Sequence, residues 1–149
     1  MKYLPFILAI SASHAYAQDT SLRTQVDQVL APIAEISSLP DALHCAGLFR
    51  SLAVGIGAGT DISDGAAAAE EYMATTGGML WFNAEGTPDT TPEEVFDVLV
   101  PLINGVAIIY IDQLPTLLGE DQNPLQDEFF DQYTYCTAIL EALQDDTGG

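Results

Sequence analysis

The sequence has almost no basic residues. Its 149 residues include 22 Asp and Glu against 3 Lys and Arg, for a formal net charge of -19, and no Lys, Arg or His follows Arg50. Such a chain repels phosphate backbones and anionic lipid headgroups, which argues against binding to nucleic acid or to a membrane surface. Only 17% of the residues are charged while 48% are hydrophobic, so a packed core is expected rather than a disordered acidic chain.

Residues 1–17 have the pattern of a cleaved signal peptide. Lys2 gives a positive start, residues 4–10 form a short apolar run, and Ala15-Tyr16-Ala17 is a cleavage site of small residues. Cleavage there leaves two arginines against all the acidic residues. We therefore predict a periplasmic or secreted protein whose residues 18–149 form a single acidic helical domain.

Cysteine is also scarce, because Cys45 and Cys136 are the only two. An even count in an exported chain favours one disulfide. A catalytic thiol or a metal pair is the alternative, but there is no C-x-x-C motif and His44 is the one histidine left after cleavage. A disulfide between them would close a loop of about 90 residues, which stabilises a fold by about 4 to 5 kcal/mol in the chain-entropy model.

Apolar residues recur at spacings of three and four, which predicts helices rather than strands. The clearest starts are Thr91-Pro92-Glu93-Glu94 and Asn123-Pro124-Leu125-Gln126, where a capping residue precedes proline at the first helical position. Two points stay open: Pro32 either kinks or divides the first helix, and Gly77-Gly78 either ends or continues the third. The expected helices cover about 20–37, 40 to the glycines at 55–59, 61–64 onward, 91 onward, and 123 to about 143.

These segments predict an all-α fold, a small antiparallel up-down bundle of four main helices plus an N-terminal helix, with one disulfide. In that bundle the second and last segments are antiparallel neighbours. Cys45 lies about five residues after the start of one and Cys136 about seven before the end of the other, so at about 1.5 Å per residue they reach the same height.

The fourth segment is the most apolar, with a predicted face of Phe96, Leu99, Val100, Ile103, Val106, Ala107 and Tyr110. Its apolar run, residues 98–111, is shorter than the roughly 20 residues of a membrane span. We predict that it is the central and most buried helix, and that the protein does not insert into a membrane after signal cleavage.

No residue is predicted to be catalytic, to bind a cofactor or to bind a metal tightly. The Gly55-x-Gly57-x-Gly59 run lacks a preceding strand and the nucleotide-loop spacing, so it is interpreted as a helix end and linker. The stretch from Asp61 to Glu71 resembles a calcium loop but would place Ile62 at a ligand position. Acidic groups at 85–94 and 120–131 hold cations weakly or form a solvated face.

Arg50 is the candidate contact residue. Its helical neighbours four residues away, Ala46 and Val54, cannot pair with a guanidinium, so any partner must come from another helix. The structural interpretation is an interhelical pair with a carboxylate, bidentate or not, and the functional one is an arginine that holds an anionic ligand.

Two functions of different classes follow. The first is a non-catalytic exported interaction or scaffold module, whose acidic surface meets a basic protein partner or bound cations. The alternative is a carrier that holds a small apolar ligand in the bundle interior, for which Trp81, Phe82, Tyr110 and the Gly77-Gly78 gap are the candidate residues. An enzyme is not favoured, because a general base near neutrality is usually histidine.

Overall fold

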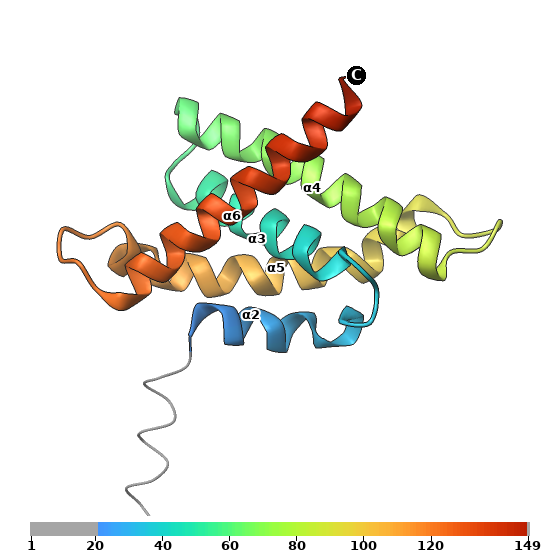
Figure 1. The fold of residues 1–149 in the computed structure, drawn as a ribbon, viewed down its shortest axis with the longest axis horizontal. Coiled ribbons are helices and arrows are strands. Elements are labelled where there is room, and N and C mark those ends of the chain that lie inside the picture. Colours follow the sequence, from blue (N-terminus) through green and yellow to red (C-terminus); the bar gives the residue numbers. More distant parts are fainter. Residues whose placement is uncertain (1–20, 149) are drawn as a thin grey trace, which may run out of the picture.

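The protein is all-helical in the part of the chain that the computed structural model describes, residues 21–148 (Figure 1). The predicted signal peptide, residues 1–17, lies outside these residues. Four long helices follow one shorter N-terminal helix, which confirms the predicted fold class. The elements are α2 (Leu22–Leu30), the 3₁₀ turn η1 (Ala31–Ile33), α3 (Leu39–Gly55), α4 (Asp61–Glu85), α5 (Pro92–Leu117) and α6 (Pro124–Thr147).

Side-chain caps fix where the helices begin. Thr91 accepts the backbone N–H of Glu94, whose carboxylate accepts the N–H of Thr91, so the predicted capping box is formed. Asn123 caps α6 in the same way, but Gln126 does not complete a box. Its amide instead donates to the carbonyls of Leu117 and Gly119, which ties the start of α6 to the end of α5.

Proline affects the helices differently at different positions. α2 ends at Leu30 and Pro32 lies in the 3₁₀ turn, so the first segment is divided rather than kinked. Pro101 and Pro115 lie inside α5, which nevertheless continues over 26 residues. α5 is therefore longer than the apolar run at residues 98–111. Among residues 21–148 it is the one helix that is long and apolar enough, by length and composition, to cross a membrane.

The most buried helix is α3, which corrects the prediction made for α5. Eleven of the 17 residues of α3 are buried, against eight of 26 in α5. Phe96, predicted in the apolar face of α5, is 54% exposed, because the buried face there begins at Val95 and Leu99.

Two glycines let neighbouring helices approach α3. A Cβ on Gly47 of α3 would lie 2.5 Å from Val106 of α5, and one on Gly77 of α4 would lie 2.7 Å from Leu43. α4 therefore runs on through Gly77-Gly78, where the backbone packs directly against a leucine of α3. The side chain of Leu43 fills the space beside Gly77, so no cavity is left there.

The disulfide Cys45–Cys136 joins α3 to α6 and is formed as predicted, with 5.3 Å between the two Cα atoms. α6 crosses the other helices obliquely rather than lying along α3 (Figure 1). Only Phe129 and Cys136 of its 24 residues are buried. The last helix thus buries few residues against the body, and the disulfide is its covalent link to α3.

Candidate functional site

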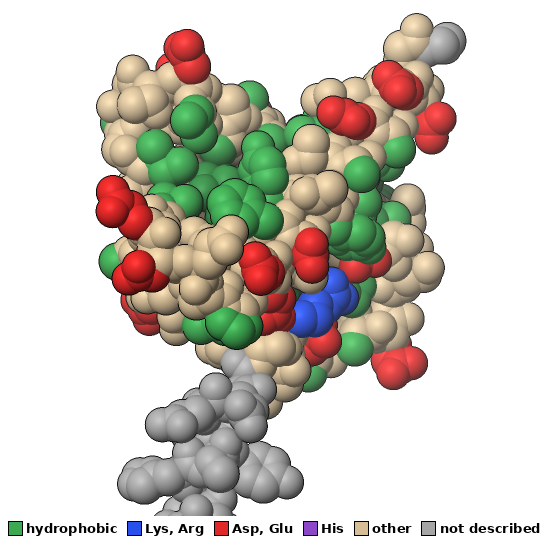
Figure 2. All heavy atoms as spheres, turned by 60° about the vertical axis from the view of Figure 1, so that its left-hand side comes forward, with side chains coloured by type: hydrophobic (Ala, Val, Ile, Leu, Met, Phe, Trp, Pro, Cys, Tyr) green, Lys and Arg blue, Asp and Glu red, His purple; other side chains and the backbone are tan. Residues whose placement is uncertain are grey.

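The surface of the described chain carries many carboxylates, and each of its arginines is paired with at least one of them. Figure 2 shows Asp and Glu spread over one face, around a hollow where hydrophobic side chains gather, with blue confined to one place. Between residues 21 and 148 the two basic side chains are Arg23 and Arg50. Arg23 pairs with Asp27 and Asp41, and Arg50 pairs with Glu70.

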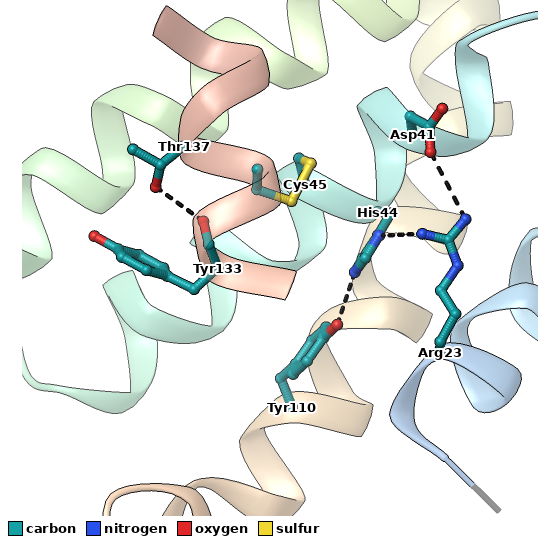
Figure 3. The surroundings of a disulfide bond; sticks show 8 residues. Arg23, Asp41, His44, Cys45, Tyr110, Tyr133 and Thr137 are labelled. Atoms are coloured by element: carbon teal, nitrogen blue, oxygen red, sulfur yellow. Dashed lines mark hydrogen bonds and ion pairs between the residues drawn. A yellow bond between two sulfur atoms is a disulfide. The ribbon is translucent and has the colours of Figure 1, made fainter. Parts of the chain in front are cut away.

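His44 lies in a buried polar network beside the disulfide (Figure 3). Its side chain is fully buried, with Nδ1 3.3 Å from Nη1 of Arg23 and Nε2 2.7 Å from the hydroxyl of Tyr110. Since a guanidinium only donates, Nδ1 accepts, and the ring proton is on Nε2 and is donated to Tyr110. The network joins α2, α3 and α5.

Burial and the neighbouring charge keep His44 neutral. Loss of hydration, and then the positive charge of Arg23, lower the pKa of His44 from 6.5 to about 4. Burial likewise raises the pKa of the Tyr110 hydroxyl, with a further contribution from the carboxylate of Glu128. His44 is enclosed on every side, so a substrate cannot reach the one histidine among the described residues.

Glu128 connects this network to α6. Its carboxylate accepts the backbone N–H groups of Leu22 at 3.1 Å and Arg23 at 2.9 Å. These groups lie at the N-terminus of α2, where N–H groups have no partner inside the helix. A carboxylate there also meets the positive end of the helix dipole.

Arg50 binds two other helices. Its Nε donates to Oε1 of Glu70 at 2.7 Å, Nη2 approaches the same oxygen, and Nη1 donates to Oδ1 of Asn104. The structure therefore places Arg50 in contact with a carboxylate of α4 and an amide of α5. Both donors to Glu70 converge on one oxygen, so the pair is not a bidentate fork.

A groove lined mainly by apolar side chains lies between α4 and α5. This groove has a volume of about 370 Å³, and Met79 and Phe82 of α4 face Val95 and Phe96 of α5 across it. Met79 is 58% exposed and Phe82 42% exposed. A second groove lies along α4 toward the end of α6 and shares Thr75 and Met79 with the first.

The residues named for an interior ligand do not meet in one cavity. Tyr110 is fully buried and bonded to His44, while Phe82 lines the open groove. Trp81 lies in a different groove, with Ile33 of the 3₁₀ turn and Leu102 of α5. Adjacent helix positions point about 100° apart, which separates Trp81 from Phe82.

The acidic clusters do not gather into a metal centre. Over residues 21–148, no three His, Cys, Asp or Glu side chains lie close enough together to hold an ion. Glu94 and Glu128 are occupied by backbone N–H groups. The glycines at 55–59 form the α3 end and the link to α4, and Thr60 rather than an aspartate caps α4.

Comparison with protein-family models, with curated proteins and with solved structures gives no match. The functional argument therefore depends on the charges, grooves and contacts of the chain itself.

Proposed function

We propose that the protein is an exported, non-catalytic interaction module that binds a cationic protein partner. The observation that carries the proposal is the state of its basic residues: Arg23 and Arg50 are both neutralised by carboxylates of the same chain. The remaining carboxylates give the surface a field of one sign. Such a field speeds encounter with partners of opposite charge and rejects partners of like charge.

Export is supported by the signal-like residues 1–17 and by the disulfide. A Cys45–Cys136 bond is compatible with an oxidising compartment outside the cytoplasm. An interaction role is supported by open apolar grooves between carboxylates, since exposed apolar patches commonly mark binding surfaces.

A carrier of a small apolar ligand is the second candidate. The groove between α4 and α5 favours it, because about 370 Å³ lies within the range of small-molecule sites. Its exposed lining argues for the first candidate, since sites for small ligands enclose most of the ligand surface.

Native mass spectrometry of the disulfide-intact protein, purified from its own host, separates the two. We expect a bound protein subunit with a basic isoelectric point, released as the ionic strength is raised through about 0.15 M. A complex that resists salt, or an acidic subunit, contradicts the proposal. A bound small apolar molecule without a subunit establishes the carrier instead.

A further inference from the structure

α4 has two opposite apolar stripes: the bundle buries one and leaves most of the other exposed, with Tyr72 half-buried beside α6. The inner stripe contains Ala66, Ala69, Met73 and Gly77, all buried against the other helices. On the opposite side of the helix a second stripe recurs at spacings of four, three, four and three. We call it the outer stripe; it consists of Ala68, Tyr72, Thr75, Met79 and Phe82.

The outer stripe forms the floor of one continuous groove. All five residues line one of the two grooves that share Thr75 and Met79. From Ala68 to Phe82 the stripe is about 21 Å long, at about 1.5 Å per residue. That length matches a partner helix of about four turns, which is longer than a small molecule of the groove's volume needs.

The residues of the outer stripe suit a helix better than a flat surface. The alternating spacing of four and three is the pattern along which one helix packs its side chains into another. Ala68 and Thr75 are small enough for close approach, while Met79 and Phe82 supply exposed apolar contact area.

Carboxylates flank this groove at both ends and decide the charge of the occupant. Glu71 lines the groove near Thr147 of α6. At the other end Glu93 lies one turn before Phe96, while Glu85, one turn after Phe82, lines the neighbouring groove with Trp81. Glu85 and Glu93 are exposed, and no basic side chain lies on α4 or α5. A second copy of this chain would bring like charges together here, so a cationic partner is favoured.

We propose that the groove over the outer stripe binds an amphipathic, lysine- or arginine-rich α-helix of the partner protein. Apolar residues of that helix, one turn apart, lie on Thr75, Met79 and Phe82, and its basic residues pair with Glu71 and Glu93. The inference rests on the proposed function and adds the binding surface and the kind of partner segment.

The test uses a synthetic peptide of about 18 residues made of Leu and Lys, with Leu at helical spacing, and a scrambled peptide of the same composition. Binding to the disulfide-intact protein is measured by calorimetry at about 0.05 M salt, below the ionic strength at which the partner is expected to dissociate. We expect the patterned peptide to bind at least about tenfold more tightly than the scrambled one. A patterned peptide of Leu and Glu should not bind.

Matched variants locate the site. Met79→Ser/Phe82→Ser should remove the preference for the patterned peptide. Val54→Ser/Ile108→Ser, which replaces residues 65% and 56% exposed outside these grooves, should keep it.

Thr75→Arg fills the groove with a cation and should abolish binding, while Thr134→Arg on α6 adds the same charge elsewhere and should weaken it by less than about threefold. Circular dichroism checks that each variant is folded. If a serine variant unfolds, the comparison of Thr75→Arg with Thr134→Arg carries the test instead.

The outcomes separate the two proposals. Equal binding of the patterned and scrambled Lys peptides, or equal effects of the groove and control variants, overturns the helix-binding groove and leaves a cationic partner in place. Equal binding of the Lys and Glu peptides overturns the proposed function as well.

Discussion

α3 and α6 are joined by one disulfide but are held in the fold by different means. Eleven of the 17 residues of α3 are buried, and its backbone is close enough to α4 and α5 to require Gly47 and Gly77. α6 buries two of its 24 residues. Packing therefore fixes α3, whereas α6 depends on Cys136, Phe129, a few half-buried apolar side chains and a few polar contacts.

Those polar contacts lie at the two ends of α6. Near its start, Glu128 accepts two N–H groups of α2 and Gln126 donates to carbonyls at the end of α5. Near its end, the hydroxyl of Tyr72 donates to the carbonyl of Leu143. Each hydrogen bond contributes only about 1 kcal/mol, so α6 is expected to open before the body unfolds.

Removing the disulfide should have the largest effect on stability, and it should act more on α6 than on α3. In the double variant Cys45→Ala/Cys136→Ala we expect a loss of about 4 to 5 kcal/mol in the free energy of unfolding, because a 91-residue separation is no longer closed in the unfolded chain. Amide hydrogen exchange should accelerate throughout α6 at low denaturant and change less in α3. Equal acceleration in both helices would show that packing holds α6 as firmly as α3.

Truncating one leucine in each helix measures the difference in packing directly. Leu48→Ala on α3 removes a fully buried side chain and should lower the free energy of unfolding by about 3 to 5 kcal/mol. Leu140→Ala on α6 removes a half-buried one and should lower it by about 1 kcal/mol. Denaturant titration of both variants checks this, and similar losses would refute the proposed difference.

The pH dependence of stability should come from α3 through His44. With a folded pKa of about 4 against 6.5 when exposed, His44 takes up a proton in the unfolded chain but not in the folded one between these values. Its contribution is full above pH 6.5 and is lost as the pH falls to 4, by about 3 kcal/mol at about 1.4 kcal/mol per pH unit.

His44→Gln keeps an acceptor for Arg23 and a donor for Tyr110 but does not titrate. From pH 6.5 to 4 the wild-type chain should therefore lose about 3 kcal/mol of unfolding free energy relative to this variant. Urea titration at both pH values measures the loss. A difference that is independent of pH would mean that His44 is charged, or hydrated, inside the fold.

Much of the fold could be predicted from the sequence because local signals and covalent chemistry agree. The capping box at Thr91 and the apolar spacing located α5, and the two cysteines admitted one simple pairing. The ranking of burial was wrong because hydropathy reports what a helix contains, not what surrounds it. α3 is central because glycine lets other helices approach it, although α5 is more apolar.

The polar network was harder to predict from the sequence. Arg50 was identified because no local partner exists, yet Glu70 and Asn104 are 20 and 54 residues away, and nothing in the spacing selects them. Arg23 was missed, although a second arginine in a chain so poor in bases was a signal. Its contact with His44 depends on how α2 crosses α3, which periodicity alone does not fix.

Replacing Arg50 tests the polar support of α3 away from the disulfide. In Arg50→Met, Glu70 loses its partner while half-buried, and we expect a loss of about 1 to 2 kcal/mol, or about 3 to 8 °C in Tm. Glu70→Gln keeps a weaker hydrogen bond and should cost less. An unchanged melting temperature in Arg50→Met would show that the pair is not structural and would favour a ligand-binding role for this arginine.

Salt should give the smallest effect, and it should act mainly on α6. This helix has six carboxylates and no basic residue, while α3 has one carboxylate, Asp41, and one arginine, Arg50. Raising the ionic strength from about 0.01 M to 0.5 M shortens the screening length from about 30 Å to a few Å, which removes repulsion between α6 and the acidic body. Hydrogen-exchange protection should rise in α6 and stay constant in α3, with a gain of less than about 1 kcal/mol overall. If α3 gains as much protection as α6, the repulsion acts on the whole fold, and the weak attachment of α6 is due to its sparse packing alone.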